Sequence, residues 1–246
     1  ACVLPAMSLS REQIDEIKQA TTKIAKAVGV VGLINIQFAM SDSHLFVLEA
    51  NPRASRTVPF VSKATGIALA KAAARLSVGA SIAALREEGL LPSSGDGVAK
   101  GISVKEAVLP WNRFRRTDGR GVDAVLGPEM RSTGEVMGIS NSFGQSYAKS
   151  QISAFGALPK NGTVFVSLAD KDKTQGIQAA QSLSRIGFRI LATAGTADAL
   201  ASKQIPCTKV RKHSEGTGPL GEKTIVELIN SGEIDLIINT PVGRGT

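Results

Sequence analysis

Side chains able to hold a metal ion or a phosphate group gather at the end of one apolar run. In HLFVLEANPRASR, residues 44–56, the run reaches Glu49 and Asn51, and Arg53 and Arg56 follow a proline. Residues two apart on a strand share a face, so the Glu49 carboxylate and the Asn51 amide point the same way. Oxygen-bearing side chains suit Mg²⁺, and guanidinium groups spread the charge of a phosphoryl group. The spacing therefore predicts part of a phosphoryl-transfer site.

A third oxygen donor is expected from the preceding apolar run. Residues 33–40 alternate in hydrophobicity and are joined to residues 44–51 by a short polar turn, which predicts a β-hairpin. The turn places Gln37 across from Glu49 or on its diagonal, within side-chain reach. Gln37, Glu49 and Asn51 would then form a set of hard ligands suited to Mg²⁺.

The same residues have a structural interpretation. Glu49 would pair with Arg53 or Arg56 at the strand end, while the two amides cap turns, because ion pairs at strand ends are common. Lys63 would add positive charge near either arrangement. From spacing alone both interpretations stay open.

The elements that position these residues fall in the first of two predicted domains, residues 1–155. Ser10 and Gln13 predict a capping box that starts a helix ending at Gly29. Residues 91–155 are rich in Gly, Pro and Ser, so we expect an irregular, strand-containing segment with a weak helix near its end. The remaining helices are expected at 67–78 and 81–88.

Regular alternation of strands and helices predicts a second domain over residues 156–246. Strand-like runs alternate with amphipathic helices, which is typical of a parallel sheet with crossover helices. The fold class is therefore α/β. The strands are expected at 163–169, 188–195, 207–212 and 235–240, with helices at 173–187, 196–204 and 224–232.

The strand ends of this second domain predict a phosphate site. The strand ending near Ala192 continues into a Thr-Ala-Gly-Thr loop that opens a helix, where amides and hydroxyls can cradle a phosphate. Ligands of open α/β sheets bind at the carboxyl ends of the strands. Considered one at a time, a lysine at such a strand end would be an ordinary solvated side chain, and a threonine would be a helix cap. The side chains converging on that edge are Lys173, Thr193, Thr196, Lys212 and Asn239.

Several blocks of the chain resemble one family. The blocks NIQF, LFVLEANPRASRTVPFVSKATG, SVKEAVLP and LGPEMRSTGEVMG are similar to the ATP-grasp ligases, and within them to the large-chain family of carbamoyl-phosphate synthase. The resemblance implies that Gln37, Glu49 and Asn51 hold Mg²⁺ or Mn²⁺ with ATP. It also implies that Arg53 meets the transferred phosphate, with Arg56 nearby. Glu129 and Arg131 in the last block are expected to pair with each other structurally, and no catalytic role is expected for them.

The resemblance implies a reaction and its partners. The reaction would be the ATP-dependent phosphorylation of carbamate to carbamoyl phosphate, in pyrimidine and arginine biosynthesis. Its parent enzyme would use bicarbonate and ammonia, the latter delivered by a small glutamine amidotransferase subunit, in a cytoplasmic oligomer of heterodimers. Because the chain starts without Met and stops just past a strand, we expect a piece of a longer protein that is inactive alone.

The second domain resembles the methylglyoxal-synthase-like regulatory fold. That resemblance implies a site for effector nucleotides of the UMP or IMP class, formed by Lys173, Thr193, Thr196, Lys212, Asn239 and Thr240. It also places Glu106 where a carboxylate binds an effector such as ornithine, although an exposed strand-end Glu is an equal alternative. The loop GTGPLGEK lacks the aspartate that a methylglyoxal synthase needs, so regulation is favoured over catalysis. The alternative function is a non-catalytic nucleotide-sensing module.

The composition of the chain limits the classes of protein to which it could belong. The net charge of +8 suits a nucleic-acid binder or a protein that handles phosphorylated molecules. The basic run at 113–121 shows no aromatic interleaving and no helical spacing, and it has turn residues in its middle, so a solvated loop is preferred to nucleic-acid binding. No apolar run approaches the roughly 20 residues of a membrane span. Cys2 and Cys207 are isolated, which suits a reducing compartment, and are expected to be inert buried thiols.

Overall fold

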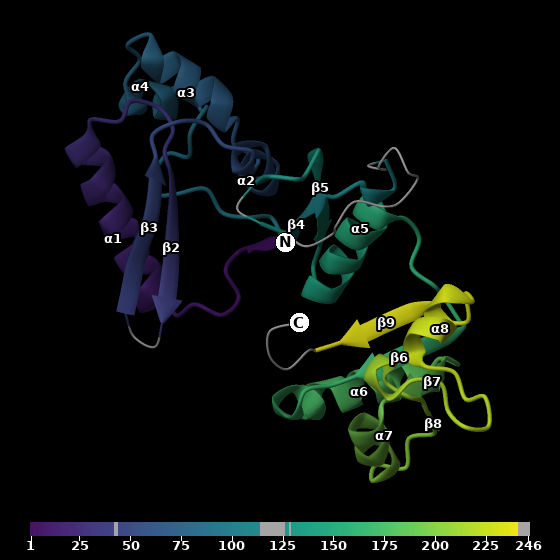
Figure 1. Ribbon diagram of the computed structural model, residues 1–246. Helices are drawn as coiled ribbons and strands as arrows, with labels where there is room; N and C mark the ends of the chain where they lie inside the picture. Colours follow the sequence, from purple (N-terminus) through teal and green to yellow (C-terminus); the bar gives the residue numbers. More distant parts are fainter. Residues whose placement is uncertain (42–43, 114–125, 128, 241–246) are drawn as a thin grey trace. The chain divides into compact units, whose positions relative to one another are not determined.

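The computed structural model describes residues 1–41, 44–113, 126–127 and 129–240 (Figure 1). The chain divides into two compact units, Ala1–Ala157 and Leu158–Thr246. Within the described ranges, none of the helices is both long enough and apolar enough to cross a membrane.

The first unit begins with the predicted capped helix. Helix α1, Arg11–Val28, follows Ser10, whose hydroxyl accepts the Gln13 N–H while the Gln13 side chain accepts the Ser10 N–H. Gly29 ends the helix in the left-handed conformation that glycine adopts without strain. The prediction of this helix and both of its ends is confirmed.

The predicted hairpin follows the helix. Strands β2, Asn35–Ser41, and β3, His44–Asn51, pair antiparallel, and a bulge falls between Gln37 and Phe38. A bulge changes the direction of the side chains beside it. The polar face lies away from the turn, and its residues are paired in the register that precedes the bulge. That register pairs Gln37 with Glu49.

A helix that the sequence did not predict comes next. Helix α2, Thr57–Thr65, contains Pro59 and two β-branched residues in its first turn, which disguise it. Proline is tolerated there because the first four N–H groups of a helix have no intrahelical acceptor. Burial of Phe60 and Ala64 stabilises α2 through tertiary contacts. The two expected helices are confirmed as α3, Leu69–Ser77, and α4, Ile82–Glu87.

The strands and the weak helix expected within residues 91–155 are confirmed, and they form a more regular layer than expected. Strands β1, Cys2–Leu4, β4, Ile102–Val108, and β5, Gly134–Ser140, make an antiparallel sheet in the order β1-β4-β5. Helix α5, Phe143–Phe155, packs on β4 and β5 (Figure 1). A short 3-10 turn, Trp111–Arg113, follows β4. Gly138 in β5 allows this close packing, because a Cβ added there would overlap the Ser146 carbonyl oxygen of α5.

The second unit is the predicted parallel sheet, in the order β8-β7-β6-β9. One face packs under α6 and α7 through Val164, Ile190 and Leu200, and the other packs under α8 through Phe165 and Leu191. The strands are β6, Thr163–Ser167, β7, Arg189–Ala192, β8, Thr208–Lys209, and β9, Leu236–Asn239. The helices are α6, Lys173–Arg185, α7, Ala194–Ala201, and α8, Ile225–Asn230.

The cap of α8 holds a carboxylate in several hydrogen bonds. The Glu227 carboxylate accepts the Thr224 N–H at 2.6 Å and the Thr217 hydroxyl at 2.8 Å. These hydrogen bonds, the backbone one above all, hold the pKa of Glu227 below its ordinary value of 4.5. A depressed folded-state pKa stabilises the fold above the unfolded pKa, and this stabilisation is lost as the pH falls through the folded value.

We therefore expect the urea midpoint of the second unit to fall on acidification from about pH 5 to about pH 3, and to fall less in Glu227→Gln. The control is Asp198→Asn, which removes an exposed carboxylate on α7. Equal acid sensitivity of wild type and Glu227→Gln would contradict the assignment.

Candidate functional site

The polar face of the hairpin brings together the predicted oxygen donors. Gln37 lies directly opposite Glu49, and its Nε2 donates to Glu49 Oε2 at 3.1 Å. Asn51 is opposite Asn35, a residue not singled out from the sequence. Asn35 lies two residues before Gln37 on the same strand, so strand periodicity alone places both amides on one face. The face thus offers one carboxylate and three amides.

The two arginines do not pair with the carboxylate. Arg53 Nη1 donates to the Ala54 carbonyl at 3.0 Å, and Arg56 Nη1 donates to Ser132 Oγ at 3.0 Å. Within the described part of the chain, Glu49 forms an ion pair with neither arginine, so the structural interpretation of an ion pair at the strand end is wrong. The carboxylate is exposed and keeps one oxygen free of Gln37.

Arg56 instead lines a cavity of about 690 Å³, here called the Arg56 cavity. Lys105 Nζ lies 3.1 Å from Glu135 Oε1 and 3.3 Å from Thr57 Oγ1, so this lysine is compensated. Arg56 and Lys63 then give the cavity a positive balance. The remaining lining residues are Pro59, Phe60, Val136, Met137, Ile139 and Ser153.

Lys105 and Glu135 were missed from the sequence because strand pairing alone brings them together. The two residues are thirty positions apart. Strands β4 and β5 are antiparallel with Lys105 opposite Met137, which puts Glu135 on the diagonal. No local spacing carries that information.

The donor set fits a metal–nucleotide complex better than a metal held by protein alone. Within residues 1–41, 44–113, 126–127 and 129–240, no cluster of three or more His, Cys, Asp or Glu side chains could hold an ion. A single carboxylate flanked by amides leaves most positions around a cation to other ligands. Mg²⁺ commonly takes those from water and substrate phosphates.

Glu106 is neither exposed nor at a strand end. It lies within β4, its side chain is 14% exposed, and Oε2 accepts a hydrogen bond from Gln151 Nε2 at 2.8 Å. The alternative of an exposed strand-end Glu is therefore wrong. Glu129 and Arg131 are both exposed.

The six residues predicted around the second sheet line one cavity of about 330 Å³, here called the strand-end cavity. They lie at or shortly after the ends of β7, β8 and β9 and at the starts of α6 and α7. Ser167, Leu168, Ala169, Asp170 and Gly195 complete the wall. Parallel strands point their carboxyl ends to one edge, which is why residues far apart in sequence meet here.

Backbone and hydroxyl groups fix the shape of this cavity. The buried Thr196 Oγ1 accepts the Leu168 N–H at 3.0 Å, and Thr193 Oγ1 lies 3.3 Å from Ser167 Oγ. The Ala169 N–H donates to Thr240 Oγ1 at 2.8 Å, which ties the end of β9 to the loop after β6. The threonines thus act on the scaffold as well as on the cavity surface.

The start of α7 differs from the sequence expectation. The helix begins at Ala194 with Thr193 as its N-cap, so the expected Thr-Ala-Gly-Thr loop is already the first turn. The Thr196 and Ala197 N–H groups bond back to the Thr193 carbonyl. The preceding amides, at the helix N-terminus, remain available to an anion.

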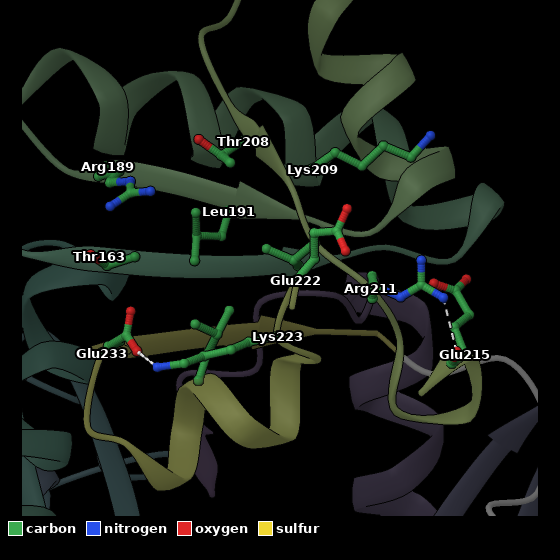
Figure 2. Close-up of a pocket in the computed structure, with 12 residues that line it drawn as sticks. Thr163, Arg189, Leu191, Thr208, Lys209, Arg211, Glu215, Glu222, Lys223 and Glu233 are labelled. Carbon is green, nitrogen blue, oxygen red and sulfur yellow. Dashed lines mark hydrogen bonds and ion pairs between the residues drawn. The ribbon is translucent and has the colours of Figure 1, made fainter. Parts of the chain in front are cut away.

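A separate hollow of about 550 Å³ lies on the α8 face of the same sheet (Figure 2). Leu191 and Leu228 form part of its lining. Its acids already have partners: Glu233 pairs with Lys223 at 2.5 Å, and Glu222 accepts the Leu220 N–H. None of the residues predicted for the phosphate site lines it.

Two other predictions have different outcomes. The expectation that both thiols are buried is wrong for Cys2, which is exposed, while Cys207 is half-buried and desolvation raises the pKa of its thiol. The basic run at 113–121 lies, apart from Arg113, outside the described residues.

Known proteins similar to this chain share both of its halves. Residues 2–85 match the family described as "Carbamoyl-phosphate synthase L chain, ATP binding domain", and residues 175–245 match the "MGS-like domain". The carbamoyl phosphate synthase large chain of Streptomyces griseus is 61% identical over 249 residues, which are 100% of this chain and 23% of that protein.

Two further large chains give the same picture. That of Streptomyces coelicolor is 61% identical over 99% of this chain and 22% of its own length. That of Mycobacterium tuberculosis is 55% identical, again over 99% of this chain and 22% of its own length. The chain therefore spans less than a quarter of the curated relatives it matches.

Proposed function

Because the chain belongs to the carbamoyl phosphate synthase large-chain family, we propose that it forms the C-terminal part of such an enzyme. In this proposal residues 1–155 complete an ATP-grasp domain that phosphorylates carbamate to carbamoyl phosphate, and residues 156–246 form an MGS-like regulatory domain. The observation that carries the catalytic part is the Gln37–Glu49 contact across the hairpin, which gathers oxygen donors on one face.

The donors have a specific role in this proposal. Gln37, Glu49 and Asn51 hold Mg²⁺ or Mn²⁺ bound to ATP, and Arg53 meets the transferred phosphate. The metal supplies positive charge to the phosphate oxygens when bound. Glu49 contributes the negative charge that recruits the cation, and the amides orient it.

The charge of the Arg56 cavity favours binding of a small anionic substrate. Arg56 and Lys63 are not balanced by the Lys105–Glu135 pair, so the cavity attracts an anion such as carbamate. In the whole enzyme we propose that bicarbonate and ammonia supply that anion, with ammonia from a small glutamine amidotransferase subunit. The product would enter pyrimidine and arginine biosynthesis.

The strand-end cavity favours a second function, nucleotide sensing. Lys173, Thr193, Thr196, Lys212, Asn239 and Thr240 surround a space at the start of α7, where a phosphate is favoured by amides and helix dipole. We propose that effector nucleotides of the UMP or IMP class bind here. Glu106 is retained as a proposed effector carboxylate for ornithine. In the alternative function, a non-catalytic sensing module, this site would bind the nucleotide and Glu49 would bind no metal.

A thermal-shift titration of the 246-residue chain separates the two functions. We expect Mn²⁺ with ATP to stabilise the wild type, and Glu49→Gln to weaken that binding about tenfold or more, because the only carboxylate of the donor set is lost. Glu16→Gln, on the exposed face of α1, is the control.

UMP and IMP are titrated in parallel. Stabilisation by UMP without any effect of Mn²⁺ and ATP would leave the sensing module as the function. No shift with any of these ligands would count against both parts of the proposal.

A further inference from the structure

The strand-end cavity contains one acidic side chain beside its cations. Asp170 belongs to the 3-10 turn Asp170–Asp172 between β6 and α6, and its Oδ1 lies 2.7 Å from Lys173 Nζ. Both residues line the cavity. The Lys173 ammonium therefore already has an anionic partner at the cavity wall.

The same ammonium lies where a bound phosphate would need it. Lys173 Nζ is 3.9 Å from the position that a Cβ would take on Gly195, in the first turn of α7. The amides of Ala194 and Gly195 have no acceptor within the helix, as in the first turn of any α-helix. A phosphate accepted by these amides lies within reach of Lys173 and competes with Asp170 for it.

Asp170 is held by its backbone but not by its side chain. The Ala169 N–H donates to Thr240 Oγ1 at 2.8 Å, and the Asp172 N–H donates to the Ala169 carbonyl at 3.0 Å, which fixes the turn. The Asp170 side chain is 95% exposed, so its carboxylate can rotate into water when another anion takes its place. The hydrogen bond from Lys173 holds the pKa of Asp170 below its ordinary value, so the carboxylate is charged at neutral pH.

We propose that Asp170 is an internal counter-ion that competes with the ligand phosphate for Lys173 and so sets the effector concentration at which the site fills. This inference rests on the nucleotide-binding role proposed above for the strand-end cavity. With Asp170 in place, the Lys173 ammonium is already paired with a carboxylate. A phosphate monoester, which carries close to two negative charges near pH 7, must displace the carboxylate to reach full contact.

Calorimetric titration of the 246-residue chain with UMP, and separately with inorganic phosphate, tests this inference. We expect Asp170→Asn to bind UMP about three- to fivefold tighter than wild type, the upper part of the range for an exposed ion pair. The matched control is Asp172→Asn, which makes the same charge change two residues away and outside the cavity lining. Its affinity should change less than about twofold. In a Lys173→Met background, Asp170→Asn should give no tightening.

The outcomes distinguish failure of the counter-ion role from failure of the nucleotide site. Equal affinities of Asp170→Asn and Asp172→Asn, with UMP bound by wild type, overturn the counter-ion role and leave the nucleotide site standing. Absence of binding in wild type and in Asp170→Asn overturns the nucleotide site, and with it the counter-ion role. Binding by Asp170→Asn alone supports both.

Discussion

Replacing Gly138 by alanine should destabilise the first unit by about 3 kcal/mol, the upper part of the usual range for overpacking. Gly138 is buried in β5 opposite Val104, beneath α5. An added Cβ would overlap the Ser146 carbonyl oxygen and lie 2.8 Å from the Ser150 amide nitrogen. Both atoms belong to the helix backbone, which cannot rotate away as a side chain would. The expected result is that α5 lifts from the sheet.

Hydrogen exchange of the α5 amides, together with urea unfolding, measures this effect. The control is Gly134→Ala in the same strand, where an added Cβ meets nothing within 4 Å. That variant should lie within about 0.5 kcal/mol of wild type. If the α5 amides are protected from hydrogen exchange equally well in Gly138→Ala and Gly134→Ala, then α5 does not approach the β5 backbone this closely.

Thr196→Val should lower the stability of the second unit by about 2 kcal/mol and weaken UMP binding about tenfold. Thr196 is 2% exposed, and its Oγ1 accepts the Leu168 N–H. Valine keeps the shape but leaves that buried N–H without an acceptor. The loss also frees the loop after β6, which carries part of the strand-end cavity, so structure and binding change together.

Thr196→Ser separates the hydroxyl from the methyl group. Serine keeps the acceptor, so binding should stay near the wild-type level while stability falls by the smaller amount of a lost methyl, about 1 kcal/mol. Urea unfolding and calorimetry with UMP measure the two effects. A Val variant that unfolds at the wild-type urea concentration would show that the Leu168 N–H finds another acceptor.

Local patterns predicted the elements whose signals lie within a few residues. The capping box at Ser10 and Gln13 and the glycine at position 29 defined α1, because caps act between residues three or four apart. Alternation of apolar runs and amphipathic helices predicted the parallel sheet of the second unit. Helix α2 was missed because Pro59 and the β-branched residues lower its propensity, while burial of Phe60 outweighs them.

The sequence by itself determined the two polar constellations: the hairpin face around Glu49 and the strand ends around Lys173. Both follow from strand periodicity and from the rule that parallel strands end at one edge, which are local or topological facts. Only the tertiary structure decided that Arg56 turns to Ser132 and a cavity with Lys105 and Glu135. Only it placed Asp170 on Lys173 and seated α5 on Gly138. The Arg56 cavity and the seating of α5 depend on side-chain direction and on packing between elements, which sequence spacing does not record. Asp170 and Lys173 are only three residues apart, so for this pair the tertiary structure decided the position at the cavity wall rather than the proximity.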